Sequence, residues 1–154
     1  VFIEGGVMAA TYMTDYSSAA EPHAQGLDAS IWSNGAHFFW IPVEGDWAEF
    51  AITLPYDTNY DISFAYTTAH DYAAYDVYFN GEKLASVDGY GTIGVSELNL
   101  GKHSYAAGTY TLKLVCTGKN AASGNYGVGI DHIIFYPEIG IAQYKEAACK
   151  ALES

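Results

Sequence analysis

Apolar and polar residues alternate along most of the chain, which predicts β-strands. Residues 47–54 read W-A-E-F-A-I-T-L and place Phe50, Ile52 and Leu54 on one face. Asn80-Gly81 stands between two such runs and is a strong signal for a two-residue hairpin turn. The alternation recurs at 60–66, 75–79, 83–87, 95–100, 110–116 and 128–136, and more weakly at 1–3, 8–13, 30–32 and 38–41.

Turn-forming residues separate these runs, as at 45–46, 55–57, 89–91 and 118–127. Many short strands without interleaved helices predict an all-β fold, an antiparallel jelly-roll β-sandwich. Only residues 141–152 depart from this pattern, because their alanine-rich composition favours a short C-terminal helix or the start of a linker. We therefore divide the chain into a β-sandwich over 1–138 and a C-terminal extension over 139–154.

The charge balance argues against two classes of partner. The 154 residues carry a net charge of −12, and the basic side chains are all lysines. Nucleic acids need a basic face and anionic membrane surfaces attract basic segments, so we expect neither partner. No apolar run approaches the ~20 residues of a membrane-spanning helix.

Of the two cysteines, Cys116 is expected in the core, and spacing alone leaves a bridge to Cys149 open.

Motifs of the common enzyme classes are missing from the sequence. It contains no G-x-S-x-G, no H-E-x-x-H, no phosphate-binding loop and no dinucleotide fingerprint. Glycosidases use two carboxylates at a defined separation, and none of the 18 acidic residues is marked as such a pair. We therefore expect a chain without catalytic activity of its own.

Aromatic residues are frequent, with 14 tyrosines, 7 phenylalanines and 3 tryptophans. Tyrosine combines an apolar ring with a polar tip, so it suits both a half-buried sheet and a wet binding surface. We expect Trp40 and Trp47 in the core, because each belongs to a predicted strand or begins one.

Five stretches, in order, resemble the galactose-binding-like carbohydrate-binding modules that are appended to bacterial glycoside hydrolases. They read F-F-W-I-P-V-E-G-D-W-A-E-F-A-I-T-L-P (38–55), Y-D-I-S-F-A-Y (60–66), H-D-Y-A-A-Y-D-V-Y-F-N-G-E-K-L (70–84), A-A-G-T-Y-T-L-K-L (106–114) and G-V-G-I-D-H-I-I-F (127–135), and F-I-E-G-G (2–6) is similar to the opening motif. The resemblance covers 1–138. It implies a jelly roll that binds a polysaccharide or oligosaccharide within a larger secreted or cell-surface bacterial protein.

Four loops combine the aromatic and polar side chains that sugar binding requires. Sugar C–H patches pack on aromatic rings, and hydroxyls bond to Asp, Asn or His beside them. The resemblance implies that an Asn before the last strand bonds the sugar, and that Tyr90 replaces a tryptophan usual in a mid-chain loop. The candidate ligand-binding residues are Trp32, His70, Asp71, Tyr72, Tyr90, Asn120, Asn125 and Tyr126. Each of these residues could instead stabilise its own loop.

The resemblance also implies a structural Ca²⁺ near the chain ends, held by Glu4 and Asp131. Calcium takes six to eight oxygens, and Gly6 stands where the opening motif has a second acidic residue. The alternative is that the two carboxylates bond nearby backbone amides.

A second function remains open from the sequence alone. A β-sandwich of this kind could mediate oligomerisation or pack on a parent enzyme. Tyr72, Tyr90 and Tyr126 would then be interface anchors rather than sugar platforms.

Overall fold

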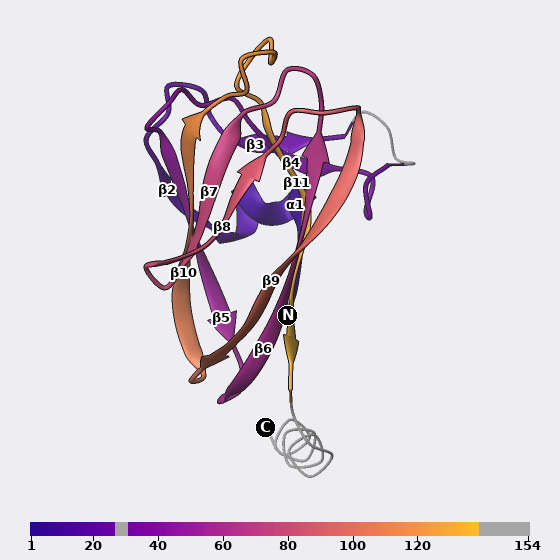
Figure 1. Cartoon of the computed structure of the whole chain (residues 1–154). Coiled ribbons are helices and arrows are strands. Elements are labelled where there is room, and N and C mark those ends of the chain that lie inside the picture. Colours follow the sequence, from indigo (N-terminus) through magenta and orange to yellow (C-terminus); the bar gives the residue numbers. More distant parts are fainter. Residues whose placement is uncertain (27–30, 139–154) are drawn as a thin grey trace.

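The computed structural model describes residues 1–26 and 31–138, and these form two antiparallel sheets packed face to face (Figure 1). This confirms the predicted all-β jelly-roll sandwich. The predicted C-terminal helix, the extension over 139–154 and Cys149 lie outside the described residues.

The first sheet is built around β11 (Val128–Pro137), which pairs along one edge with β6 (Thr58–Thr68). β9 (Gly94–Tyr105) lies on the far side of β6. The other edge of β11 pairs with β4 (His37–Trp40) and then with β1 (Phe2–Glu4), and β3 (His23–Gln25) lies outside β4.

The second sheet has the order β2 (Met13–Tyr16), β5 (Trp47–Leu54), β10 (Gly108–Gly118), β7 (Ala74–Phe79) and β8 (Glu82–Asp88). The hairpin between β7 and β8 turns at Asn80 and Gly81, which have φ values of 52° and 79°. Both lie in the left-handed region that a type I′ turn requires.

Large side chains from the inner faces of both sheets fill the space between them. Phe38 of β4 meets Phe50 of β5 at a ring distance of 5.4 Å, and Phe79 of β7 meets Phe135 of β11 at 5.0 Å. Burial of such side chains stabilises the fold by about 1.5–3 kcal/mol each. Trp40 belongs to this core, as expected, with 1% of its surface exposed.

Three sequence-based predictions were wrong in detail. Residues 8–13 were expected as a strand, but α1 (Gly5–Val7) and a π-helix, η1 (Met8–Tyr12), precede β2. Gly5 lies directly against β11, where an added Cβ would lie 1.8 Å from the carbonyl oxygen of Ile130, so no larger residue fits at the start of this helical segment. The predicted strand at 30–32 is a turn at its described residues 31 and 32.

The third incorrect prediction concerns Trp47, which was expected in the core. It is half-buried on the outer face of the second sheet, where the ammonium group of Lys113 lies 5.2 Å from its ring centroid. The alternation of β5 explains this position, because a core face that contains Phe50 and Ile52 excludes residue 47.

The connections that follow β6, β8 and β10 all lie at one end of the sandwich, the upper end in Figure 1. Three of the four candidate loops lie at this end, which therefore brings residues distant in sequence together.

Candidate functional site

Backbone hydrogen bonds join the three connections into one platform. The amide of Ala69 donates to Gly89 at 3.1 Å, and the amide of Gly89 donates to Ala73 at 2.9 Å. The amide of Ala73 donates to Gly127 at 2.7 Å, and that of Gly127 donates to Asp71 at 3.0 Å. Loops that bond to one another in this way hold their side chains in fixed positions.

Two glycines permit this close approach. A Cβ at Gly127 would lie 2.6 Å from the ring of Tyr72, and a Cβ at Gly89 would lie 2.9 Å from the carbonyl oxygen of Ala73. The buried hydroxyl of Ser123 also donates to the carbonyl oxygen of Tyr72 at 2.7 Å. Any larger residue at 127 would push the Tyr72 ring away from the platform.

A hollow of about 370 Å³ opens beside the platform. Four of the predicted site residues line it, namely Trp32, His70, Asp71 and Tyr72. The other lining residues are Gln25, Ile31, Phe39, Thr67, Thr68, Ala69 and Ile93. The lining is therefore mostly apolar, with a few polar groups contributed by loops and strand ends.

The aromatic rings form walls of the hollow and are not displayed freely to solvent. Trp32 is 6% exposed and Tyr72 is 7% exposed, and Phe39 lies 6.1 Å from the Tyr72 ring. Burial, followed by the nearby charge of Asp71, raises the pKa of the Tyr72 hydroxyl. The idea that these two rings stand open as platforms is therefore corrected, since only a small part of each ring can meet a ligand.

The remaining predicted residues lie on the platform but do not line the hollow. The side-chain amide of Asn120 donates to Asp88 at 3.4 Å, and the backbone amide of Tyr90 donates to Asp88 at 3.0 Å. The Oδ1 atom of Asn125 accepts from the backbone amide of Tyr126 at 2.8 Å. The side chains of Asn120 and Asn125 thus bond within the platform, whereas Tyr90 and Tyr126 take part in these bonds through their backbone amides.

Sequence reasoning missed the buried polar groups at the base of the hollow. His37, on β4, is fully buried, and its ring stacks on Trp32 with centroids 3.9 Å apart. Burial, with a smaller contribution from His23, lowers the pKa of His37 to about 4. The alternation of H-F-F-W at 37–40 could have indicated this, because it places His37 and Phe39 on the face opposite the core residue Phe38.

Glu4 and Asp131 do converge, but on a serine. The hydroxyl of Ser33 lies 2.6 Å from Oε2 of Glu4 and 3.1 Å from Oδ1 of Asp131, and its backbone amide donates to the same Oδ1 at 2.8 Å. Asp131 reaches this position because it is the extra residue of a bulge, between Ile130 and His132, in the pairing with β6.

This cluster supplies only part of a calcium ligand set. It contains two carboxylates, whereas Ca²⁺ takes six to eight oxygens. Over residues 1–26 and 31–138, no group of three or more His, Cys, Asp or Glu side chains is placed to hold a metal ion. The hydrogen bond from the Ser33 amide to Asp131 matches, for Asp131, the alternative that the sequence left open, whereas Glu4 accepts from the Ser33 hydroxyl and not from a backbone amide.

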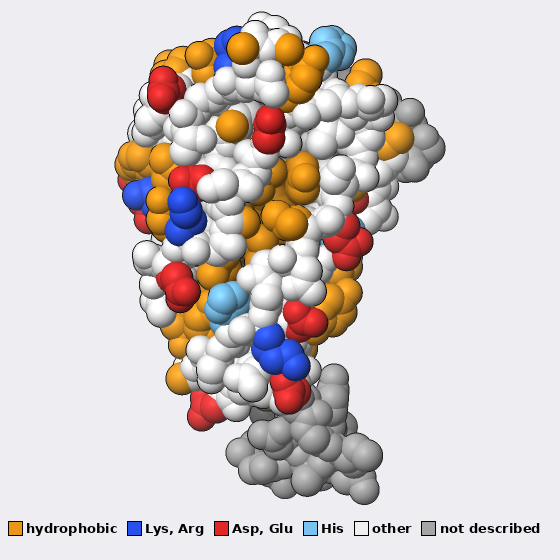
Figure 2. Space-filling view, viewed as in Figure 1, with side chains coloured by type: hydrophobic (Ala, Val, Ile, Leu, Met, Phe, Trp, Pro, Cys, Tyr) orange, Lys and Arg blue, Asp and Glu red, His pale blue; other side chains and the backbone are white. Residues whose placement is uncertain are grey.

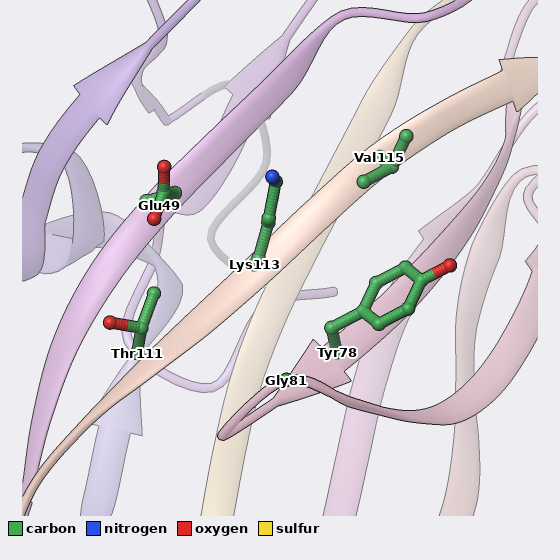
Figure 3. A pocket seen from close by; sticks show the side chains of 6 residues that line it. All are labelled: Glu49, Tyr78, Gly81, Thr111, Lys113 and Val115. Carbon is green, nitrogen blue, oxygen red and sulfur yellow. The ribbon is translucent and has the colours of Figure 1, made fainter.

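A second hollow, of about 460 Å³, lies on the outer face of the second sheet (Figure 3). Glu49 of β5, Tyr78 of β7 and Lys113 of β10 project into it from neighbouring strands. Its lining has one aromatic ring, that of Tyr78, and no residue from the platform. The first hollow has the rings of Trp32, Phe39 and Tyr72 beside polar side chains of the loops. We therefore take the first hollow as the candidate site.

The surface carries no continuous basic patch on the face seen in Figure 2, where lysines are interspersed with acidic side chains. Among the described residues, no helix is both long and apolar enough to span a membrane.

Comparison with known proteins gives structural relatives only. No family model matches the sequence, and no curated protein matches it. A segment of a Paenibacillus xanthan lyase superposes with a TM-score of 0.71 and 22% identity, covering 81% of this chain. The match takes up 12% of the lyase, so this chain corresponds to a small part of that enzyme.

Two further structures match along nearly their whole length. A family 35 carbohydrate-binding module from an environmental isolate has a TM-score of 0.58 and 16% identity, over 90% of this chain and 93% of the module. The CBM36-1 domain of a multidomain xylanase from the hindgut metagenome of Trinervitermes trinervoides has a TM-score of 0.56 and 15% identity, over 92% and 98%. The chain therefore has the jelly-roll β-sandwich fold of the carbohydrate-binding modules.

Proposed function

We propose that the chain is a non-catalytic carbohydrate-binding module and that the hollow beside Trp32 and Tyr72 binds a neutral sugar chain. The observation that carries this proposal is the hollow itself, in which aromatic walls lie next to the polar side chains of His70 and Asp71. An apolar enclosure with a few polar groups is typical of ligand sites, and about 370 Å³ is at the small end of their range.

The lining favours a neutral ligand over an acidic one. No lysine or arginine lines the hollow, and Asp71 does. A uronic acid would bring its carboxylate near that of Asp71 without a cation to compensate, whereas sugar hydroxyls can donate to the Asp71 oxygens. Ile93, which is 65% exposed, adds an apolar surface for sugar C–H groups at the rim.

The setting that we propose is a larger secreted or cell-surface bacterial protein. A small site of this kind gives weak binding, in the range of about −4 to −8 kcal/mol for dissociation constants of 1 mM to 1 μM. Attachment to a second binding or catalytic domain compensates by raising the local concentration of ligand. The matching segment of the xanthan lyase and the matching domain of the xylanase are both parts of larger proteins, which supports such an arrangement.

The alternative, an assembly domain, receives less support. It needs tyrosine rings at the surface as interface anchors, but Tyr72 is buried, and Tyr90 and Tyr126 are half-buried. Light scattering distinguishes the two, because an assembly domain would form a stable oligomer at micromolar concentration.

Isothermal titration calorimetry tests the proposal with cellohexaose, xylohexaose, mannohexaose and, as an acidic comparison, trigalacturonic acid. We expect heat from at least one neutral oligosaccharide and none from the acidic one. The substitutions His70→Ala and Asp71→Ala should weaken that binding tenfold or more. Thr111→Ala in the second hollow is the matched control and should leave it unchanged. Absence of heat with every neutral ligand at millimolar concentration would refute the proposal.

A further inference from the structure

A chain of buried polar groups lies beneath the hollow. The indole Nε1–H of Trp32 donates to Oγ1 of Thr67 at 3.0 Å, and this Oγ1 lies 2.8 Å from Nδ1 of His37. On the other side of the same ring, Nε2 of His37 lies 2.7 Å from Oε1 of Gln25. Three of these residues also line the hollow, namely Trp32, Thr67 and Gln25. The series of hydrogen bonds therefore begins and ends at the wall of the hollow.

The chemistry of the four groups determines which of them donates and which accepts in each hydrogen bond. An indole nitrogen can only donate, so Thr67 must accept from Trp32. The hydroxyl of Thr67 then has one proton to give, and Nδ1 of His37 is the acceptor within reach. A neutral imidazole that accepts at Nδ1 carries its proton at Nε2, and this proton goes to Oε1 of Gln25.

The opposite direction would leave a buried proton without a partner. If His37 donated from Nδ1, Thr67 would accept twice, and within the described part of the chain its own hydroxyl proton has no other acceptor. A buried donor left unsatisfied costs about 1–3 kcal/mol. Thr67 is 3% exposed, so only a small part of its surface meets the hollow and the hydroxyl proton is best satisfied by His37.

Close packing keeps the ring in place. A Cβ at Gly129 would lie 2.6 Å from Nδ1 of His37 and 2.8 Å from Cβ of Thr67. Trp32 stacks on the imidazole with an angle of 15° between the planes. The ring therefore cannot turn over without moving β11 or the indole, and the orientation of the Gln25 amide is fixed with it.

We propose that Gln25 determines ligand specificity in the hollow by presenting its amide Nε2–H₂ to an oxygen acceptor of the bound sugar. This inference rests on the proposed function. Its physical basis is that Oε1 is already held by His37, so the amide nitrogen is the polar end that remains for a ligand. The site thus requires an acceptor oxygen at this position, which a sugar hydroxyl supplies and a deoxy position does not.

Two measurements test the inference. Long-range ¹H–¹⁵N correlation spectra of the wild-type protein report the tautomer of His37, and we expect the proton at Nε2. Calorimetry with cellohexaose, xylohexaose and mannohexaose compares the wild type with Gln25→Glu, which still accepts from His37 but has no donor for a ligand. Binding should weaken tenfold or more. Asn80→Asp, which makes the same amide-to-acid change in the distant hairpin, should stay within twofold of the wild type.

The outcomes separate the two proposals. If the wild type binds a neutral oligosaccharide and Gln25→Glu binds it equally well, the inference is wrong and the proposed function stands. A proton at Nδ1 of His37 also overturns the inference, because the amide would then be reversed and its oxygen would face the ligand. If the wild type binds none of the three oligosaccharides, both proposals fail.

Discussion

Acidification should destabilise this protein through one buried histidine. His37 is fully buried beneath the hollow, and its pKa is lowered to about 4, chiefly by burial. The folded protein therefore keeps His37 neutral at pH values at which the unfolded chain protonates it. Stability is lost as the pH falls from the unfolded pKa of 6.5 toward the folded one.

The magnitude follows from this difference. Between pH 6.5 and pH 4.5 the unfolded chain holds one more proton than the folded one, and each pH unit is worth about 1.36 kcal/mol. The free energy of unfolding therefore falls by at most about 2.7 kcal/mol over these two pH units. Because water reaches the adjoining hollow and screens the charge, we expect about 2 kcal/mol.

Urea unfolding at pH 7 and pH 4.5 measures the effect, with His37→Gln as the comparison. The carboxylates titrate in both proteins, so their contribution cancels in the difference between the two pH dependences. The wild type should lose about 2 kcal/mol more than the variant. His23, which lies close enough to lower the pKa of His37, is present in both. If His37→Gln does not fold, NMR titration of the wild type still gives the pKa of His37, and a value near 6.5 would refute the reasoning.

Three further predictions concern the glycines and the acidic cluster. Gly127→Ala should lower the free energy of unfolding by about 1–3 kcal/mol in urea titrations and weaken sugar binding, because its Cβ would lie 2.6 Å from the Tyr72 ring. Gly81→Ala, at φ 79° with nothing within 4 Å of its Cβ, should cost about 1–2 kcal/mol through the backbone alone and leave binding unchanged in calorimetry. Adding 5 mM Ca²⁺ (about five times a weak dissociation constant of ~1 mM) should leave the Tm unchanged in thermal scans, because Ser33 bonds both Glu4 and Asp131. A rise in Tm that EDTA reverses would show that further oxygens complete a calcium site.

The strands were the predictable part of the fold, because alternation reports directly which face is buried. The range 47–54 matches β5, and the Asn80-Gly81 turn lies where predicted. β9 was predicted only to residue 100 but continues to Tyr105. It continues through an irregularity at Gly101, whose φ is 94° and whose amide donates to the side chain of Asn99 at 2.6 Å. A turn-forming residue inside a strand cannot be told from a turn by pattern alone.

The site was predictable only in outline. Sequence could indicate the loops at 67–75 and 119–127, because aromatic and polar residues cluster there. It could not indicate that Gln25 and Phe39, from β3 and β4, would line the same hollow as His70, because this depends on how the first sheet pairs. Nor could it separate Asn125, which bonds its own loop, from Asp71, which faces the hollow.

The bonded platform also bears on how strongly such a site can bind. Loops that order on binding lose conformational entropy, and that loss subtracts from affinity. Here the amides of Ala73 and Gly127 are already bonded across the connections, so the platform carries little of this cost. Under the proposed function, affinity is then limited by the small area of ring that Trp32 and Tyr72 leave open. A variant that exposes more of either ring should therefore gain more affinity than one that stiffens the loops.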